Sequence, residues 1–506
     1  MSSSRTENVI RNTKTGIILR FVRMIANFVL KTVFIRFLGS QYFGLSNLFS
    51  DILTLLSFAE LGIGSAITYS MYEPVSNGDN YKIAALINFY RKAYRIVATI
   101  VFFAGISVIP FLDKVIKNVP DIKENITFIY FLYIVNTASS YLLIYKSVIF
   151  EAKQKRSEIL SIESIYTIIR LIIECVELII FKEYLLYLVT DIIINILQNF
   201  TISQKANGEY EHIKDAKLEE NEYKRIFHDI FALAMYQVAF VALASSDSII
   251  ISTVIGTEIV GFLGCYKMIT NQLISFIQTF FYGAMASVGN LAATDNTEKQ
   301  HELFNEINFT FYSIAYFCCV ELFLILDNFV EFWAGNKYVL GQSVVIVLVI
   351  DFYLNVMRQI VSMFRTTNGL FVQGKYRPLF MAAINIILSI VLGIKWGVLG
   401  VLLATIISKL LTEVWYDPWI IYKNVYKKST IEYYKQYLVY IISIVFVCAI
   451  SFGICSLIHI NNIIALIFVK AIIGFIVSFI IYFIMWRNTE LYYKIKARAI
   501  SVIHRK

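Results

Sequence analysis

Charged residues and proline are scarce in this chain of 506 residues. Asp, Glu, Lys and Arg make up only 16% of it and there are five prolines, whereas 58% of the residues are hydrophobic and 40 are phenylalanine. The mean hydropathy is +0.66. Soluble domains contain about 25% charged residues. The composition therefore excludes an ordinary soluble domain and predicts long helices surrounded by lipid.

Residue patterns that carry chemistry are also missing. The sequence contains no Walker-type nucleotide loop, no histidine cluster and no large outer loop that could house an active site. We therefore expect no enzyme, no cofactor, no metal and no nucleic-acid partner. The six cysteines lie in apolar stretches without metal-ligand spacing, as small core residues do, at Cys175, Cys265, Cys318, Cys319, Cys448 and Cys455.

Long apolar segments dominate what is present. About 20 apolar residues cross the hydrocarbon core, which predicts roughly fourteen spans, from Gly16–Leu38 to Ile463–Trp486. The eleventh span is the shortest and ends near Lys395-Trp396-Gly397. Residues Met1–Lys14 are polar and basic and precede a full span, so they are not a cleavable signal peptide. Lysine and arginine concentrate in alternate loops, which predicts that both termini are cytoplasmic.

The chain also repeats itself. Leu38–Gly44 is echoed by Ile255–Gly261, and Glu151–Arg156 is echoed by Val372–Arg377. Duplicated units in a transporter favour two lobes around a central site with alternating access. We expect an N-terminal six-helix lobe (1–204), a charged cytoplasmic linker (205–225), a C-terminal six-helix lobe (226–422), and two extra transmembrane helices with a basic cytoplasmic tail (423–506).

Charges inside the spans are the most informative feature. The first span carries Arg20, Arg23, Asn27 and Lys31 at intervals of three, four and four, which places them on one helical face. A charge at bilayer depth costs a few kcal/mol or more unless it faces protein or water, so such residues usually mark a path for a substrate or an ion. Snorkelling to the inner surface is the alternative for Arg20 and Arg23.

The fifth and tenth spans repeat this pattern. Glu163, Arg170, Glu174 and Glu177 share one face of the fifth span, where a structural ion pair between Arg170 and Glu174 is the alternative. The tenth span presents Asp351, Asn355, Arg358, Ser362 and Arg365. Arg365 lies near the cytoplasmic end and can snorkel. Lys409 and Glu413 have the spacing of a further structural pair.

The deep cations at least balance the carboxylates, which favours an amphiphile with a phosphate or diphosphate head over a cationic drug. The candidate headgroup ligands are Arg20, Arg23, Lys31, Arg170, Arg358, Arg365 and Lys267. The candidates for binding a coupling ion are Asp247, Glu60 and Glu174. For Asp247, which lies among small serines, a fixed hydrogen bond between helices is the alternative.

Several short motifs follow one another in a characteristic order. They are the basic first helix, Phe37–Gly44, Ala59–Gly62, Asp247 with Ile249–Ile251 and Ile255-Gly256, Gly374-Lys375, and Trp396–Val401. In this order they resemble the Wzx-type polysaccharide flippases, a branch of the superfamily that also holds the multidrug and toxin extrusion transporters. That family often has Asp where this chain has Glu60, which keeps the charge and lengthens the arm.

The resemblance implies an all-α integral membrane protein with about fourteen transmembrane helices, whose two lobes form a V-shaped cavity. It implies a carrier in the bacterial plasma membrane that flips undecaprenyl-diphosphate-linked oligosaccharide by ion-coupled alternating access for surface polysaccharide assembly. A polysaccharide polymerase and a chain-length regulator are the expected protein partners. Two other hypotheses stay open at this point: a cation-coupled exporter of small molecules, and a scaffold of envelope assembly that transports nothing.

Overall fold

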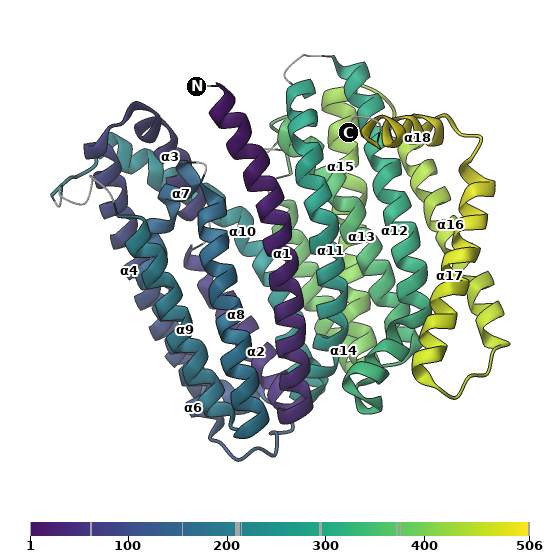
Figure 1. Ribbon diagram of the computed structural model, residues 1–506, viewed down its shortest axis with the longest axis horizontal. Coiled ribbons are helices and arrows are strands. Elements are labelled where there is room, and N and C mark those ends of the chain that lie inside the picture. Colours follow the sequence, from purple (N-terminus) through teal and green to yellow (C-terminus); the bar gives the residue numbers. More distant parts are fainter. Residues whose placement is uncertain are drawn as a thin grey trace. The chain divides into compact units, whose positions relative to one another are not determined.

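The computed structural model describes residues 2–503, apart from 61–62, 154, 208–212, 214, 293–295, 371–372 and 375. The described residues form helices joined by short connections, with no strand among them (Figure 1). The predicted all-α class is therefore correct. The chain divides into two compact units, Met1–Gly261 and Phe262–Lys506, each of which we describe by itself. The lobe boundaries inferred from the sequence stay a prediction.

In the first unit, α1 packs along α8, α8 along α9, α9 along α6, and α6 along α4, while α10 packs against α2 and α3. The helices of this unit are α1 (Ser2–Leu38), α2 (Ser40–Leu56), η1 (Ser57–Glu60), α3 (Ile63–Asn77), α4 (Asn80–Val108), η2 (Ile109–Phe111), α5 (Leu112–Val115), α6 (Ile126–Ile144), η3 (Tyr145–Ser147), α7 (Val148–Ala152), α8 (Arg156–Ile180), α9 (Tyr184–Lys205) and α10 (Glu220–Val254). The next helix, α11 (Thr257–Ala292), begins in this unit and continues in the other.

In the second unit, α12 packs against α13, α16 and α17, and α13 packs against α14 and α15. The helices of this unit that follow α11 are α12 (Thr297–Ala334), η5 (Asn336–Tyr338), α13 (Gln342–Thr367), α14 (Arg377–Leu411), α15 (Glu413–Ile421), the π-helical turn η6 (Tyr422–Tyr426), α16 (Ile431–Ser456), α17 (Ile463–Trp486) and α18 (Glu490–Ile503).

Eight helical segments of the described chain are long and apolar enough to cross a membrane. Helices α1 and α8 are not among them, because each holds more than two charged residues along one span length. The chain is a multi-pass membrane protein.

One of the eight segments contains two crossings. Within α14, Gly397 adopts φ 61° and ψ −140°, which is not helical. The Asn385 amide donates to the Thr405 hydroxyl at 2.9 Å across the two arms, and a Cβ on Gly400 would lie 2.0 Å from the Leu392 carbonyl oxygen. The chain therefore folds back tightly at Gly397, at the position where the eleventh span was predicted to end.

The second span, predicted from hydropathy over Phe43–Ser70, is not one continuous helix. Helix α2 ends at Leu56, the 3₁₀ turn η1 follows, and α3 starts at Ile63. Ser57 donates its hydroxyl hydrogen to the Leu53 carbonyl at 2.7 Å, and such back-bonding competes with the helical ladder. The break places Glu60 at the end of the turn η1.

The two copies of the repeated motif touch each other. A Cβ on Gly44 would lie 2.2 Å from the Thr257 carbonyl oxygen, and one on Gly261 would lie 2.7 Å from the Ser40 carbonyl oxygen. Each motif thus places its last glycine against the third residue of the other. The Ser40 hydroxyl also donates to the Glu258 carboxylate. Only glycine allows backbones to approach this closely.

Replacing Gly44 by Ala should destabilise the protein by about 1–3 kcal/mol, because the added methyl group overpacks a contact between backbones. Thermal unfolding in detergent micelles measures this effect. Gly453→Ala is the matched control, since a Cβ there would meet nothing within 4 Å. Equal melting temperatures for the two variants would contradict the packing described here.

Candidate functional site

A polar cavity of about 440 Å³ lies within the first unit. Helices α1, α2, α6 and α9 and the turn η1 contribute most of its wall. Its polar lining residues are Lys31, Ser46, Ser50, Thr54, Ser57, Glu60, Tyr133, Asn136, Thr137, Tyr141, Tyr187 and Asp191. Pockets that take small molecules typically measure about 300–1,000 Å³, so this cavity can hold a headgroup.

An ion-pair cluster reaches the cavity through Asp191, which lines it. The Arg170 Nε lies 3.1 Å from Asp191 Oδ1 and 3.8 Å from Glu174 Oε1. The Asn136 amide donates to the other Asp191 oxygen at 2.7 Å, and the Asn195 amide donates to Asn136 at 2.8 Å. Arg170 and Asp191 are each only about a quarter exposed. These contacts join α8, α9 and α6 through charged and amide groups inside the bilayer region.

Lys31 reaches the same cluster from α1. Its ammonium group lies 5.2 Å from the centre of the Phe34 ring and 5.6 Å from that of Phe43. Glu174 and Asp191 are the carboxylates whose charges act on it. Within the described part of the chain no direct salt bridge fixes this ammonium group, which is held over the two aromatic rings.

Glu174 is the most enclosed member of the cluster. Its side chain is 0% exposed, and neither carboxylate oxygen receives a hydrogen bond within the described part of the chain. The groups that face it are Lys31 from α1, Asp191 and Tyr187 from α9, Tyr133 from α6, and Arg170, Cys175 and Glu177 on its own helix. A buried carboxylate is costly when it is ionised and lacks hydrogen bonds.

Arg23, a further charged residue predicted to lie on the same face of the first helix, forms a contact away from the cavity. Arg23 Nη1 lies 2.5 Å from Glu163 Oε2, where α1 packs along α8. Neither residue lines the cavity described above. The side chain of Arg20 lies outside the described residues.

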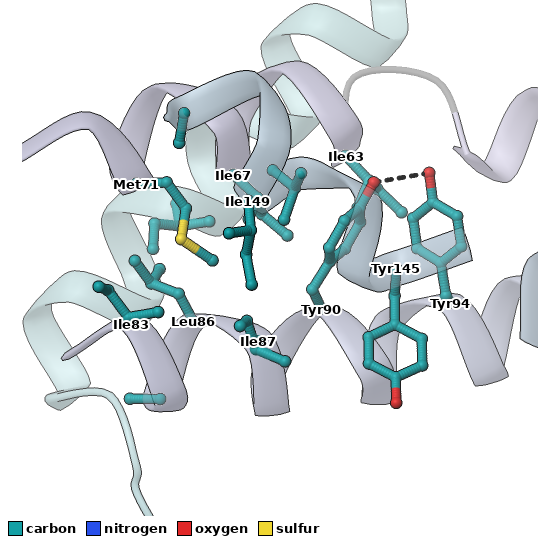
Figure 2. Close-up of a cluster of buried hydrophobic side chains, with 14 of the residues drawn as sticks. Ile63, Ile67, Met71, Ile83, Leu86, Ile87, Tyr90, Tyr94, Tyr145 and Ile149 are labelled. Carbon is teal, nitrogen blue, oxygen red and sulfur yellow. Dashed lines mark hydrogen bonds between the residues drawn. The ribbon is translucent and has the colours of Figure 1, made fainter. Parts of the chain in front are cut away.

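Glu60 does line the cavity, from the turn η1. Tyr94 donates a hydrogen bond to its Oε1 at 2.8 Å, and Tyr90 in turn donates to Tyr94 at 2.8 Å. Figure 2 shows these two tyrosines beside an apolar cluster that includes Ile63 and Ile67. The tyrosine chain holds this carboxylate at the cavity wall.

Asp247 is also buried, in α10, together with Ser245, Ser246 and Ser248. It does not line the cavity. The small serines surround it as the sequence suggested.

A second charged network lies in the second unit. Arg365 donates from Nη1 to Asp417 at 2.9 Å and from Nε to the Leu370 carbonyl at 3.0 Å, and it is fully enclosed. Arg377 lies 3.0 Å from Asp417 and 3.3 Å from Glu413, and Arg358 lies 3.7 Å from Glu413. Arg365 therefore ties the end of α13 to α15 and does not snorkel.

The predicted pair of Lys409 with Glu413 is wrong. Lys409 instead contacts Asp351 at 2.5 Å and donates to the Asn355 amide oxygen at 2.9 Å. Glu413 faces two arginines of other helices, as given above. The four-residue spacing identified two charged residues but not their partners. Helix α13 supplies the partner of Lys409, and α13 and α14 supply the arginines that face Glu413.

Of the predicted site residues in the first unit, Lys31 and Glu60 line the cavity. Arg170 and Glu174 do not line it, but they belong to the ion-pair cluster that includes the lining residue Asp191. Arg358, Arg365 and Lys267 belong to the second unit. In the cluster beside the cavity, two cations face two acids, Glu174 and Asp191. Sequence reasoning missed Asp191 and Asn136. The four-residue spacing of Asp191, Asn195 and Asn199 in the sixth span was the signal that could have found the first of these.

Solved structures with the same fold are transporters. An inward closed lipid II flippase MurJ superposes with a TM-score of 0.67 at 15% identity, covering 93% of this chain and 98% of that one. An inward-facing multidrug resistance MATE transporter gives 0.58 at 14% identity, covering 78% and 97%. A MOP-superfamily transporter from Pyrococcus furiosus gives 0.56 at 13% identity, covering 83% and 96%. No protein-family model and no curated protein sequence matches the chain.

These similarities show the fold. They agree with the predicted class of an all-α membrane protein, and the flippase matches over almost the entire length of both chains. The other two transporters leave about a fifth of this chain unmatched.

Proposed function

We propose that the chain is a membrane transporter that flips a lipid with an anionic diphosphate head, an undecaprenyl-diphosphate-linked oligosaccharide, for surface polysaccharide assembly. The near-complete overlap with a lipid II flippase carries this proposal. A fold can host several activities, so the substrate class has to come from the site. The proposed setting is the bacterial plasma membrane, with both termini in the cytoplasm.

The cavity of the first unit supports an anionic head. Lys31 lines the cavity, offers three N–H donors and lies over an aromatic ring, with no salt bridge among the described residues. The Arg170 guanidinium lies 3.1 Å from the carboxylate of Asp191, which also lines the cavity. Hydroxyl and amide groups line the remainder, which suits sugar hydroxyls and phosphate oxygens alike. In this proposal Lys31 and Arg170 bind the diphosphate while it crosses, and Glu174 and Asp191 balance these cations when no substrate is bound.

A second candidate is a cation-coupled exporter of small molecules. It is favoured by the equal number of acids and cations in the cluster and by the MATE-type fold similarity. Overexpression that raises drug resistance would support this candidate over the flippase.

Replacing Lys31 by Ala should slow flipping on the order of tenfold or more, since a hydrogen bond to a charged group contributes about 1.5–3 kcal/mol. The measurement is the rate at which undecaprenyl-diphosphate-linked oligosaccharide in proteoliposomes becomes accessible to a sugar-binding lectin outside. Lys31→Arg should retain most of the rate. In cells, the Ala variant should lose surface glycan at a normal protein level.

The matched control is Lys153→Ala, which removes a lysine from an exposed turn outside the cavity. Its flipping rate should equal that of the unaltered protein. A Lys31→Ala variant with an unchanged rate would exclude Lys31 as a headgroup ligand. An unaltered protein that moves no lipid-linked oligosaccharide would refute the substrate assignment itself.

A further inference from the structure

A second cavity, far along the chain from the first, lies at the turn between α15 and α16. It measures about 570 Å³, and no carboxylate among the described residues lines it. We call it the lysine pocket. Its lining residues are Trp419, Lys423, Lys427, Lys428, Ser429, Thr430, Ile431 and Tyr434.

The chain path explains why lysines converge here. After α15 the backbone makes the π-helical turn η6, and Lys427 then adopts a left-handed conformation with φ 53°. The Lys428 N–H donates to the Tyr422 carbonyl at 3.2 Å, which closes the turn before α16 starts at Ile431. Three lysines separated by only a few residues thereby surround one space.

These lysines have little countercharge. Lys423 lies 4.6 Å from the centre of the Trp419 ring, and Lys428 lies 3.7 Å from the strongly exposed Glu298 carboxylate. Among the described residues, neither Lys423 nor Lys427 forms an ion pair. The first turn of α16 adds backbone N–H groups and the positive end of a helix dipole, offset in part by the exposed Glu432. The pocket can therefore accept a phosphate group.

An apolar stripe leaves the lysine pocket along α16. Ile431, Leu438, Ile442 and Val445 lie on one helical face and are each more than half exposed. Tyr434, which lines the pocket, lies on the same face. In a membrane protein such a stripe contacts lipid chains, and the aromatic and lysine side chains at its start mark the headgroup level. A phosphate in the pocket is thus placed at the end of a lipid-facing surface.

We propose that the lysine pocket binds the phosphate of an anionic phospholipid whose acyl chain lies along this stripe of α16. The site is separate from the headgroup cavity of the first unit, and the proposal does not depend on which substrate the protein transports. Lys423 and Lys427 neutralise the phosphate, and Trp419 and Tyr434 hold the glycerol region. Basic pockets between transmembrane helices bind anionic headgroups in this way.

The experiment is a binding titration of the purified full-length protein in detergent with dioctanoyl phosphatidylglycerol. Dioctanoyl phosphatidylcholine is the uncharged comparison. The variant Lys423→Gln/Lys427→Gln should bind phosphatidylglycerol about tenfold or more weakly, since each lysine near a lipid surface contributes measurably to binding. Lys423→Arg/Lys427→Arg should bind like the unaltered protein.

Lys435→Gln is the matched control, because it removes a charge from an exposed position of α16 that does not line the pocket. It should leave binding unchanged, and thermal unfolding should show that all variants fold. Undiminished binding by the double Gln variant would overturn the proposal. Displacement by free sn-glycerol 3-phosphate at equal affinity would also overturn it, in favour of a site for soluble phosphate.

Discussion

Replacing Asp417 by Ala is expected to destabilise the protein by about 3–5 kcal/mol, because the change leaves two buried arginines without their shared acid. Arg365 and Arg377 lie 2.9 and 3.0 Å from this carboxylate, and each side chain is less than a tenth exposed. Total stabilities of folded proteins are only about 5–15 kcal/mol. The loss is therefore a large fraction of the whole, and it should appear as a strongly lowered melting temperature in detergent.

A graded series sharpens this test. Asp417→Asn keeps an oxygen that can accept from one arginine and should be destabilised less than the Ala variant. Asp113→Ala removes an exposed carboxylate and should melt like the unaltered protein. If Asp417→Ala also melted unchanged, the network would contribute nothing to stability, and its charges would be available for another role.

The second large effect is expected at Glu174. Under the proposed function, Lys31 and Arg170 turn from Glu174 to the bound diphosphate head. The Glu174 carboxylate then lacks a cationic partner and binds a proton. Two nearby cations repel a metal ion, which favours a proton as the coupling ion. Glu174→Gln cannot exchange a proton. A pH gradient should therefore accelerate flipping by the unaltered protein and leave flipping by Glu174→Gln unaffected.

The measurement is the flipping rate in proteoliposomes with and without a pH gradient. Glu177→Gln is the matched control one turn further along α8, since Gln can still accept the hydrogen bond that Thr190 donates to Glu177 at 2.7 Å. It should respond to the gradient like the unaltered protein. Acceleration of Glu174→Gln by the gradient would assign coupling to another residue, with Glu60 the next to test.

Much of the fold could be predicted because span length and helical periodicity act within one segment. The all-helical class, the turn at Gly397 and the proximity of Arg170 to Glu174 all follow from such local rules. The break after Leu56 was missed, since the segment stays apolar across it and the serine back-bonds that accompany it are not visible in hydropathy.

The site was predictable only in part for a related reason. Spacing along one helix shows which side chains share a face, but the partner comes from whichever helix packs there. Asp191 meets Arg170 because α9 packs along α8, and Lys409 meets Asp351 because α14 packs along α13. Such pairings between helices depend on tertiary packing, which a single sequence does not contain.

The reciprocal contact of Gly44 and Gly261 has a consequence for how this sequence can drift. Each glycine is confined by the backbone of the other copy. A methyl group added at one glycine would therefore displace the backbone segment that carries the other glycine. The two heptapeptides therefore restrict one another's mutational tolerance, although residues 45–254 lie between them. Random mutagenesis of either copy should recover few viable side chains at its final position.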